Sequence, residues 1–223
     1  EKYGPSNYAI YMNKDYGNVK GFTFSLTKRY DRVTKTSAFV DYTYQVTEGN
    51  SVKSGSFYYN ALSGEEEEKR IVPLSWDQRH ILNSIVSVGD PGNWNLGLIS
   101  KLSSGWPYTP NIPDANYVPL SNSGRKPWQW RIDMRLHKNF KVGKFQYIVY
   151  TKIYNLLDRR NERYVFNDTG RAGYTYVSQS TQETKGFVDH YGESGVHTWS
   201  EYQVRPQYYT APRSINIGFS LDF

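Results

Sequence analysis

Histidine, serine and acidic side chains are the groups in this chain that by type could perform acid–base or metal chemistry. Of the 4 histidines, His190 and His197 lie near Asp189 and Glu193, but their spacing matches no recognised zinc-ligand pattern. No serine lies in a local signature of a hydrolase, which must hold a nucleophile beside a base. The chain has no cysteine, which excludes disulfides and thiolate catalysis. The sequence therefore predicts no enzyme activity, no metal site and no cofactor.

Aromatic side chains make up 17% of the chain and are the residues best suited to ligand recognition. Their rings stack on sugars and other ring-bearing ligands, and tyrosines among polar residues contact adaptable polar ligands. On this basis the predicted ligand-contacting residues are Trp106, Tyr108, Tyr174, Tyr176, Trp199 and Tyr202. The alternative for the aromatic residues beside strand ends is a membrane-interface belt, which also accounts for Trp76, Trp128 and Trp130.

Charge excludes a nucleic-acid partner. The net charge is +6, but Lys and Arg are scattered singly rather than gathered in a basic stripe. The densest charge run is the four glutamates at residues 65–68, which either bridge divalent cations between lipopolysaccharide phosphates or form a solvated loop tip. No apolar run reaches the ~18 residues of a transmembrane helix. Any membrane contact must therefore be made by other elements.

The elements that position these residues are β-strands, because the apolar residues recur with a period of two. In the last strand Ile215, Ile217 and Phe219 alternate with Asn216 and Gly218 without exception. Two segments, 79–90 and 145–157, carry apolar residues on both faces, so the pattern does not assign their faces. Seven strands are predicted, at residues 17–30, 36–47, 78–90, 93–104, 128–140, 144–157 and 213–223, and residues 8–12 are a candidate for the end of another.

The connections between these strands alternate strictly in length. Short turns at residues 31–35, 91–92 and 141–143 alternate with long segments at 48–77, 105–127 and 158–212. Outer-membrane barrels segregate connections in this way, with short periplasmic turns and long extracellular loops. The fold class predicted is all-β, an antiparallel up-and-down transmembrane barrel segment of about seven strands. His80 and His137, on strands among polar neighbours, are expected to form hydrogen bonds in the lumen of such a barrel.

Five segments, in order, resemble the C-terminal barrel portion of TonB-dependent outer-membrane receptors. They are residues 77–83 (DQRHILN), 104–109 (SGWPYT), 131–140 (RIDMRLHKNF), 154–161 (YNLLDRRN) and the final strand, and residues 19–22 (VKGF) look like an upstream strand of the same family. The resemblance covers nearly the whole chain, so residues 1–223 are expected to be one part of such a barrel. Receptors of this family have about 22 strands, which implies that the plug and the N-terminal strands are absent here.

The resemblance implies an outer-membrane receptor that imports a scarce, bulky ligand of the siderophore, glycan or peptide class. Its surroundings are outer-membrane lipid and lipopolysaccharide. TonB, the energy-transducing partner of the family, is expected to act only through the absent plug and N-terminal region. The alternatives are a small independent barrel, porin-like or adhesive, and a soluble carbohydrate-binding β-sandwich, which also accounts for the aromatic residues.

The end of the chain resembles an outer-membrane assembly signal. The residues that carry it are Asn216, Gly218, Leu221 and the terminal Phe223, and the departure is Leu221, where an aromatic residue is commoner. A strand that offers backbone hydrogen bonds at a free edge can be added to a partner sheet. The barrel-assembly machinery is therefore the expected partner of this strand.

Overall fold

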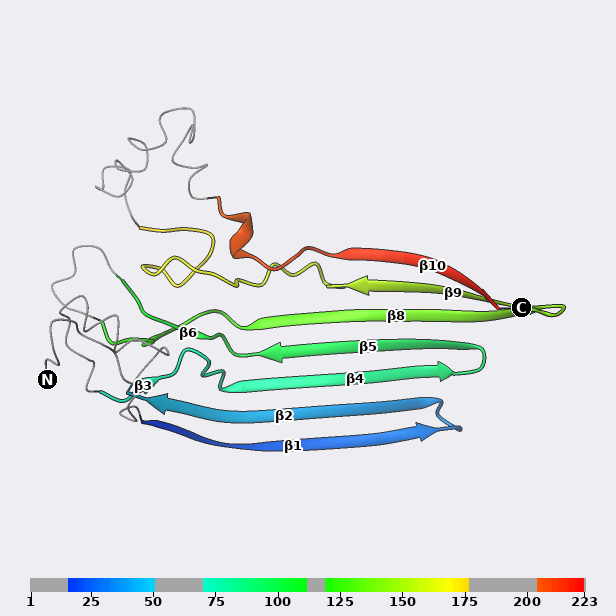
Figure 1. Ribbon diagram of the computed structural model, residues 1–223, viewed down its shortest axis with the longest axis horizontal. Helices are drawn as coiled ribbons and strands as arrows, with labels where there is room; N and C mark the ends of the chain where they lie inside the picture. Colours follow the sequence, from blue (N-terminus) through cyan, green and yellow to red (C-terminus); the bar gives the residue numbers. More distant parts are fainter. Residues whose placement is uncertain (1–15, 51–69, 112–118, 177–203, 223) are drawn as a thin grey trace, which may run out of the picture.

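The computed structural model describes residues 16–50, 70–111, 119–176 and 204–222, and it contains one large antiparallel sheet. Seven long strands lie side by side in chain order (Figure 1). They are β1 (Gly17–Asp31), β2 (Thr36–Gly49), β4 (His80–Asp90), β5 (Trp94–Ser103), β8 (Gln129–Val142), β9 (Phe145–Tyr154) and β10 (Ser214–Asp222). The predicted strand number and the up-and-down order are confirmed.

The sheet is a meander in which each strand pairs with the next long strand along the chain. Within the described residues β1 and β10 have a partner on one edge only, so the sheet does not close on itself. No helix among the described residues is long and apolar enough to cross a membrane. The only helical element described is a 3-10 turn, η1 (Pro206–Tyr208).

The connections are sorted by length between the two ends of the sheet. Residues 32–35, 91–93 and 143–144 form short turns at one end, where β10 also ends (Figure 1). The segments 50–79, 104–128 and 155–213 leave from the opposite end, which we call the loop end. The segregation of connection lengths expected from the sequence is therefore present.

The strand register places nearly all large apolar residues on one face of the sheet. Residues directly opposite each other share a face, so the pairs Phe24–Tyr42, Val86–Leu98 and Leu98–Met134 extend the apolar alternation from strand to strand. The apolar face contains Phe22, Phe24, Leu26, Val40, Tyr42, Leu82, Val86, Leu96, Leu98, Ile132, Met134, Leu136, Val149, Ile153, Ile215, Ile217 and Phe219. Nothing in the described structure covers it: Phe24 is 61% and Phe219 79% exposed.

The opposite face is mostly polar. Its cross-strand partners include Ser25 with Asp41, whose side chains are joined by a hydrogen bond of 2.7 Å, and Asn83 with Lys101. Its apolar residues include a row of three neighbours, Phe39, Ile85 and Ile99. The sheet thus has two chemically distinct faces.

The structure assigns the two segments whose faces the pattern left open. In β4, Leu82 lies on the apolar face and Ile81 on the polar face, and in β9 Val149 is on the apolar face and Ile148 on the polar face. Strand β9 ends at Tyr154 rather than residue 157, because Asn155 has a φ of 55° and turns the chain.

The expectation that His80 faces the polar side was wrong. His80 pairs with Tyr44 and shares the apolar face, where its Nδ1 lies 2.9 Å from the Tyr42 hydroxyl. It joins an aromatic cluster at the loop end, with ring centroids 5.2 Å from Tyr44 and 5.5 Å from Trp128. His137, which is paired with Asn95, lies on the polar face as expected.

Burial is concentrated at the loop end rather than on the sheet. The buried apolar residues of the described structure are Val72, Leu74, Val165 and Ala172, all outside the long strands. The chain folds back there in short pairings: β3 (Val72–Pro73) against β2, and β6 (Pro107–Tyr108) against β7 (Gly124–Arg125). This loop-end layer is what positions the candidate site.

Gly105 allows the β6–β7 pairing to form. A Cβ atom at this position would lie 1.6 Å from the backbone oxygen of Lys126, a clash that only movement of the main chain relieves. The close approach is stabilised by a 2.9 Å hydrogen bond from the Lys126 N–H to the carbonyl of Trp106. Glycine is therefore required here by packing rather than by a positive φ.

We expect Gly105→Ala to destabilise the loop end by about 2 kcal/mol, because overpacking at a rigid backbone contact forces the chain apart. The matched control is Gly92→Ala in a short turn, where the nearest atom to a new Cβ is a side-chain oxygen of Asp90 at 3.7 Å. Thermal unfolding followed by circular dichroism compares the two variants. A Gly105→Ala protein as stable as Gly92→Ala would contradict the packing account.

Candidate ligand-binding site

The loop end is organised around one buried carboxylate, Asp77. Its side chain is 0% exposed, and Oδ1 accepts a 2.9 Å hydrogen bond from the Thr47 N–H. Oδ2 accepts from Arg79 Nε at 3.3 Å and forms an ion pair with Arg125 Nη2. Arg125 Nη1 also donates to the Asp77 carbonyl at 2.9 Å. Asp77 therefore joins β2, the start of β4 and the β6–β7 pairing.

Electrostatics keep Asp77 ionised. Burial alone raises the pKa of this carboxyl, but the hydrogen bonds from Arg125, Thr47 and Arg79, together with the charge of Arg125, outweigh it and hold the pKa below its ordinary value of 3.8. A buried charge that loses its partners is costly. The interactions of Asp77 are therefore required for the loop end to stay folded.

Neighbouring residues of the same segment attach β4 to the end of β5. Gln78 Nε2 donates to the Ser104 carbonyl at 3.0 Å, and the His80 N–H donates to Ser104 Oγ at 3.1 Å. Ser104 in turn donates its N–H to the His80 carbonyl at 2.9 Å. Residues 77–80 and 104–105 thus form a hydrogen-bonded clamp across adjacent strands.

A second clamp attaches the last long loop to β8. Asn161 accepts the Trp130 N–H at Oδ1 and donates Nδ2 to the Trp130 carbonyl, both at 2.9 Å. Asn155 Nδ2 donates to the carbonyls of Arg159 and Ala211 at 3.1 Å. Both asparagines are buried. Their side-chain amides form hydrogen bonds to the backbone beyond the point where strand-to-strand backbone pairing ends.

Glu162 shapes the chain beyond this clamp. Its Oε1 accepts from Arg171 Nη2 at 2.7 Å, and its Oε2 accepts the Ala172 N–H at 2.6 Å. This interaction closes a compact turn over residues 162–172. The turn brings Tyr164 and Asn167 toward the β6–β7 pairing.

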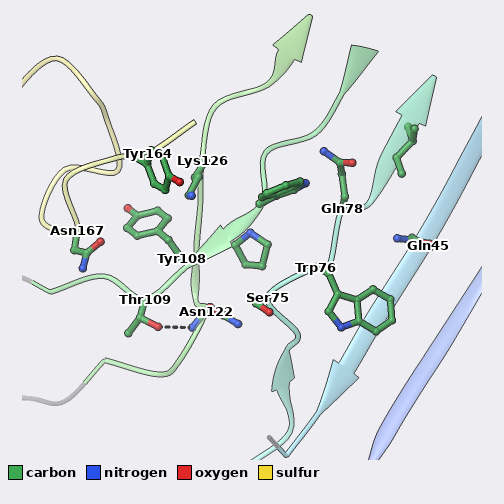
Figure 2. A pocket seen from close by; sticks show the side chains of 13 residues that line it. Gln45, Ser75, Trp76, Gln78, Tyr108, Thr109, Asn122, Lys126, Tyr164 and Asn167 are labelled. Carbon is green, nitrogen blue, oxygen red and sulfur yellow. Dashed lines mark hydrogen bonds between the residues drawn. The ribbon is translucent and has the colours of Figure 1, made fainter. Parts of the chain in front are cut away.

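An open cavity of about 860 Å³ lies beside Gln78 of the first clamp and the turn over residues 162–172, and Figure 2 shows the side chains that line it. It is lined by Gln45, Ser75, Trp76, Gln78, Ile81, Trp106, Pro107, Tyr108, Thr109, Asn122, Lys126, Tyr164 and Asn167. Gln45 and Ile81 lie on the polar face of β2 and β4, so the cavity opens on that side of the sheet. Its lining of indoles, amides and hydroxyls suits a ring-bearing, hydrogen-bonding ligand.

The two indoles of the cavity are accessible to a ligand. Trp76 is 52% exposed and Trp106 46% exposed. Tyr108 differs, because its ring packs on Gly124 and Gly170, where added Cβ atoms would approach within 2.5 and 2.3 Å. Trp76 and Trp106 can therefore stack on a ligand, whereas Tyr108 is held in place as part of the wall.

Burial also sets the charge of the groups around Tyr108. Burial, together with the nearby Asp168 charge, raises the pKa of Tyr108, so the phenol is neutral and available as a hydrogen-bond donor. Burial lowers the pKa of Lys126, whose Nζ donates to the Arg163 carbonyl at 3.0 Å and lies 5.8 Å from the Tyr164 ring. The wall opposite Trp76 thus presents the Lys126 side chain and the phenols of Tyr108 and Tyr164 (Figure 2).

The structure brings together some of the predicted ligand residues and not others. Trp106 and Tyr108 line the cavity. Tyr174 and Tyr176 pack against each other, 5.8 Å apart and edge to face, outside its lining. Trp199 and Tyr202 lie outside the described residues. The amide residues of the cavity were not among the predicted residues, because Gln45, Gln78, Asn122 and Asn167 come from segments that only the tertiary fold brings together.

The proposed assembly-signal residues are placed on β10. Asn216 and Gly218 lie on the polar face opposite Lys152 and Tyr150, and Leu221 lies on the apolar face opposite Tyr147. The Tyr150 ring covers Gly218, where an added Cβ would approach it within 2.5 Å. Phe223 lies outside the described residues.

Among the described residues no group of three or more His, Asp or Glu side chains has metal-binding geometry, and His190 and His197 lie outside that part of the chain.

Comparisons of the chain with known protein families, with curated proteins and with solved structures found no match in any of the three.

We expect Asp77→Asn to destabilise the protein by about 2 kcal/mol, because the hydrogen bonds from Arg125 and Arg79 lose their charged acceptor. The control is Asp90→Asn, which removes a solvent-exposed ion pair to Lys35 at 3.6 Å and should change stability by less than about 1 kcal/mol. The readout is thermal unfolding at neutral pH. Equal stability of the two variants would show that Asp77 does not hold the loop end together.

The same carboxylate predicts a pH dependence. Because the folded pKa of Asp77 lies below the unfolded value of 3.8, its contribution to stability is complete above pH 3.8 and is lost as the pH falls through the lower folded pKa. The stability difference between wild type and Asp77→Asn should therefore shrink toward zero under acid conditions. A difference that is constant with pH would contradict this account.

Proposed function

We propose that this chain forms part of the wall of an outer-membrane β-barrel receptor, of the TonB-dependent kind that its sequence segments resemble. The receptor takes up a scarce, bulky ligand of the siderophore, glycan or peptide class. The chain contributes seven strands of the wall and the outer loops. TonB acts on a part of the receptor outside this chain.

The observation that carries the proposal is the uncovered apolar face. It runs across all seven strands, and its residues at β10, such as Ile217 at 75% exposed, are open to the surroundings. An apolar surface of this extent in water promotes association and marks a membrane or protein contact. Hydrocarbon chains cover such a face without any matching protein surface, which favours lipid as the partner.

Two hydrogen-bonded pairs and one aromatic cluster on this face support the proposed membrane wall. Trp130 Nε1 donates to Ser100 Oγ at 3.2 Å, so two polar groups on the apolar face satisfy each other where water is scarce. Lys28 Nζ, near the short turns, bonds Thr36 Oγ1 at 2.6 Å. At the loop end the cluster of Tyr42, Tyr44, His80 and Trp128 provides the amphipathic rings that favour the level of lipid and lipopolysaccharide headgroups.

The free edge of β10 supports recognition by the barrel-assembly machinery. One edge of β10 pairs with β9, and its other edge has no partner among the described residues. Strand addition at such an edge uses backbone hydrogen bonds, with the apolar side chains of β10 on one face.

Ligand capture is assigned to the cavity beside Trp76 and Trp106, at the end from which the long loops leave.

The alternative functions fit the observations less well. A soluble carbohydrate-binding sandwich requires a second sheet packed on the apolar face, and among the described residues the only other sheet is the two-stranded β6–β7 pair. A small independent barrel shares the wall chemistry. In a small independent barrel, however, the edge strands β1 and β10 would have to pair with each other.

The proposed orientation predicts which residues can be reached from outside the cell. We expect a cysteine replacing Ser123, in a long loop, to react with a membrane-impermeant maleimide on intact cells that express the protein from its intact gene. A cysteine replacing Gly92, in a short turn, should react only after the membrane is permeabilised. Labelling of Gly92→Cys alone would invert the orientation, and recovery of the protein without detergent would overturn the membrane assignment.

The two faces predict opposite responses to a buried charge. Ile217 shares its row with Thr151 and Leu136, whereas Phe219 lies level with Lys138 near the short turns, so Ile217 is the position closer to the centre of the wall. Ile217→Arg should destabilise the folded protein in lipid by about 2–4 kcal/mol. Ser220→Arg, on the polar face of the same strand, should be tolerated. Denaturant unfolding in vesicles measures both, and equal damage would refute the face assignment.

A further inference from the structure

The polar face carries a group of cations that the cavity does not use. They lie on three adjacent strands, β5, β8 and β9, and we call them the basic ladder: Lys101, Arg131, Arg135 and Lys152. All four share the face onto which the cavity opens. Lys101 and Arg135 are exposed, and Lys152 is half-buried.

The ladder places like charges directly opposite each other. Lys101 pairs with Arg131 across β5 and β8, and Arg135 pairs with Lys152 across β8 and β9. Side chains in such pairs are close neighbours, and like charges directly opposite destabilise a sheet. The alternation of apolar and polar residues requires only a polar side chain at each of these four positions. Uncharged polar residues would meet that requirement without the repulsion, so the fold does not explain the two cationic pairs.

The described structure compensates only part of this charge. Asp133, on the same face between the two pairs, accepts from Arg131 Nε at 2.8 Å and from the Asn155 N–H at 2.8 Å. Lys152 Nζ lies 5.1 Å from the centre of the Tyr150 ring. Among the described residues no carboxylate forms an ion pair with Lys101, Arg135 or Lys152. Asp133 also attracts the charge of Arg135 without forming an ion pair with it. Lys101, Arg135 and Lys152 therefore keep hydrogen-bond donors available for an anion.

The ladder continues from the floor of the cavity. Ile81, which lines the cavity, pairs with Ser103, and Lys101 is the next residue of β5 on the same face. Arg131 and Arg135 are four residues apart on β8, which corresponds to roughly 13 Å. The two cationic pairs thus lie along the polar face with Asp133 between them, too far apart to hold one small anion together.

We propose that the basic ladder binds an elongated ligand with two or more anionic groups, and that this ligand is an acidic oligosaccharide. The exposed indoles of Trp76 and Trp106 supply ring-stacking surfaces at the cavity, and the ladder supplies charge-assisted hydrogen bonds to successive carboxylates. This proposal rests on the proposed receptor function and specifies its ligand class. Because the cations repel each other in the empty protein, a bound polyanion relieves a repulsion that the fold itself carries.

The test uses protein expressed from its intact gene and purified in an uncharged polyoxyethylene detergent. Isothermal titration calorimetry measures the binding of trigalacturonate, of the neutral galactose trisaccharide with the same linkage, and of inorganic tripolyphosphate. The variant is Arg135→Gln/Lys152→Gln. The control is Lys141→Gln/Lys144→Gln, which removes the same charge from exposed positions beside a short turn.

We expect trigalacturonate to bind wild type and the control alike, and Arg135→Gln/Lys152→Gln at least about tenfold more weakly. The neutral trisaccharide should bind more weakly than trigalacturonate, and tripolyphosphate, which has no ring to stack, should do the same. The melting temperature of Arg135→Gln/Lys152→Gln should equal or exceed that of wild type, because a cationic repulsion has been removed.

Four results would overturn the proposal: no binding of trigalacturonate by wild type, equal binding of the neutral trisaccharide, an equal loss of affinity in the control, or a lowered melting temperature of the ladder variant. Tripolyphosphate binding as tight as that of trigalacturonate would reject the saccharide assignment. Failure of the receptor function itself is distinguished by the cysteine-labelling experiment, because a protein that is absent from the cell surface fails there whatever it binds.

Discussion

Side chains on a β-strand point alternately to opposite faces, and the antiparallel register carries that alternation from strand to strand. Leu98, for example, lies between Val86 and Met134, and each of these neighbours extends the same apolar face. A slip of one residue in any pairing would bring polar residues onto this face and apolar residues onto the other. Every later feature, including the proposed lipid contact, the cavity and the basic ladder, depends on this register.

The sheet and the loop end are stabilised differently. The strands form hydrogen-bonded ladders with exposed faces, whereas the loop end buries polar groups such as Asp77, Asn155 and Asn161. Buried polar groups must be satisfied. Asn155 and Asn161 each make more than one hydrogen bond to neighbouring backbone, and Asp77 is satisfied by the Thr47 N–H and two arginine side chains. Segments 77–83, 104–109 and 154–161, on which the family resemblance rests in part, therefore contain residues that hold neighbouring strands together. This structural role does not depend on which ligand the chain binds.

The cavity and the basic ladder share the polar face but place different demands on the fold. Around the cavity the side chains are held by packing, as Tyr108 is against Gly124 and Gly170. In the ladder, opposed cations such as Arg135 and Lys152 weaken the sheet that holds them. Such a cost fits the proposed binding role, because charges that stay unpaired in the empty protein add affinity for an anion.

The sequence alone determined the all-β class, the seven strands and the division of connections into short and long, because a period of two and turn residues are local signals. It also indicated Trp106 and Tyr108 from residue type and position. Only the tertiary structure assigned the faces of β4 and β9, where apolar residues on both sides cancel the alternation, and placed His80 beside Tyr42 on the apolar face. Only the structure joined Asp77 to Arg125, gathered Gln45 and Asn167 into one cavity, and set Arg135 opposite Lys152. Each of these contacts joins segments distant in the chain or depends on strand register, and local periodicity encodes neither.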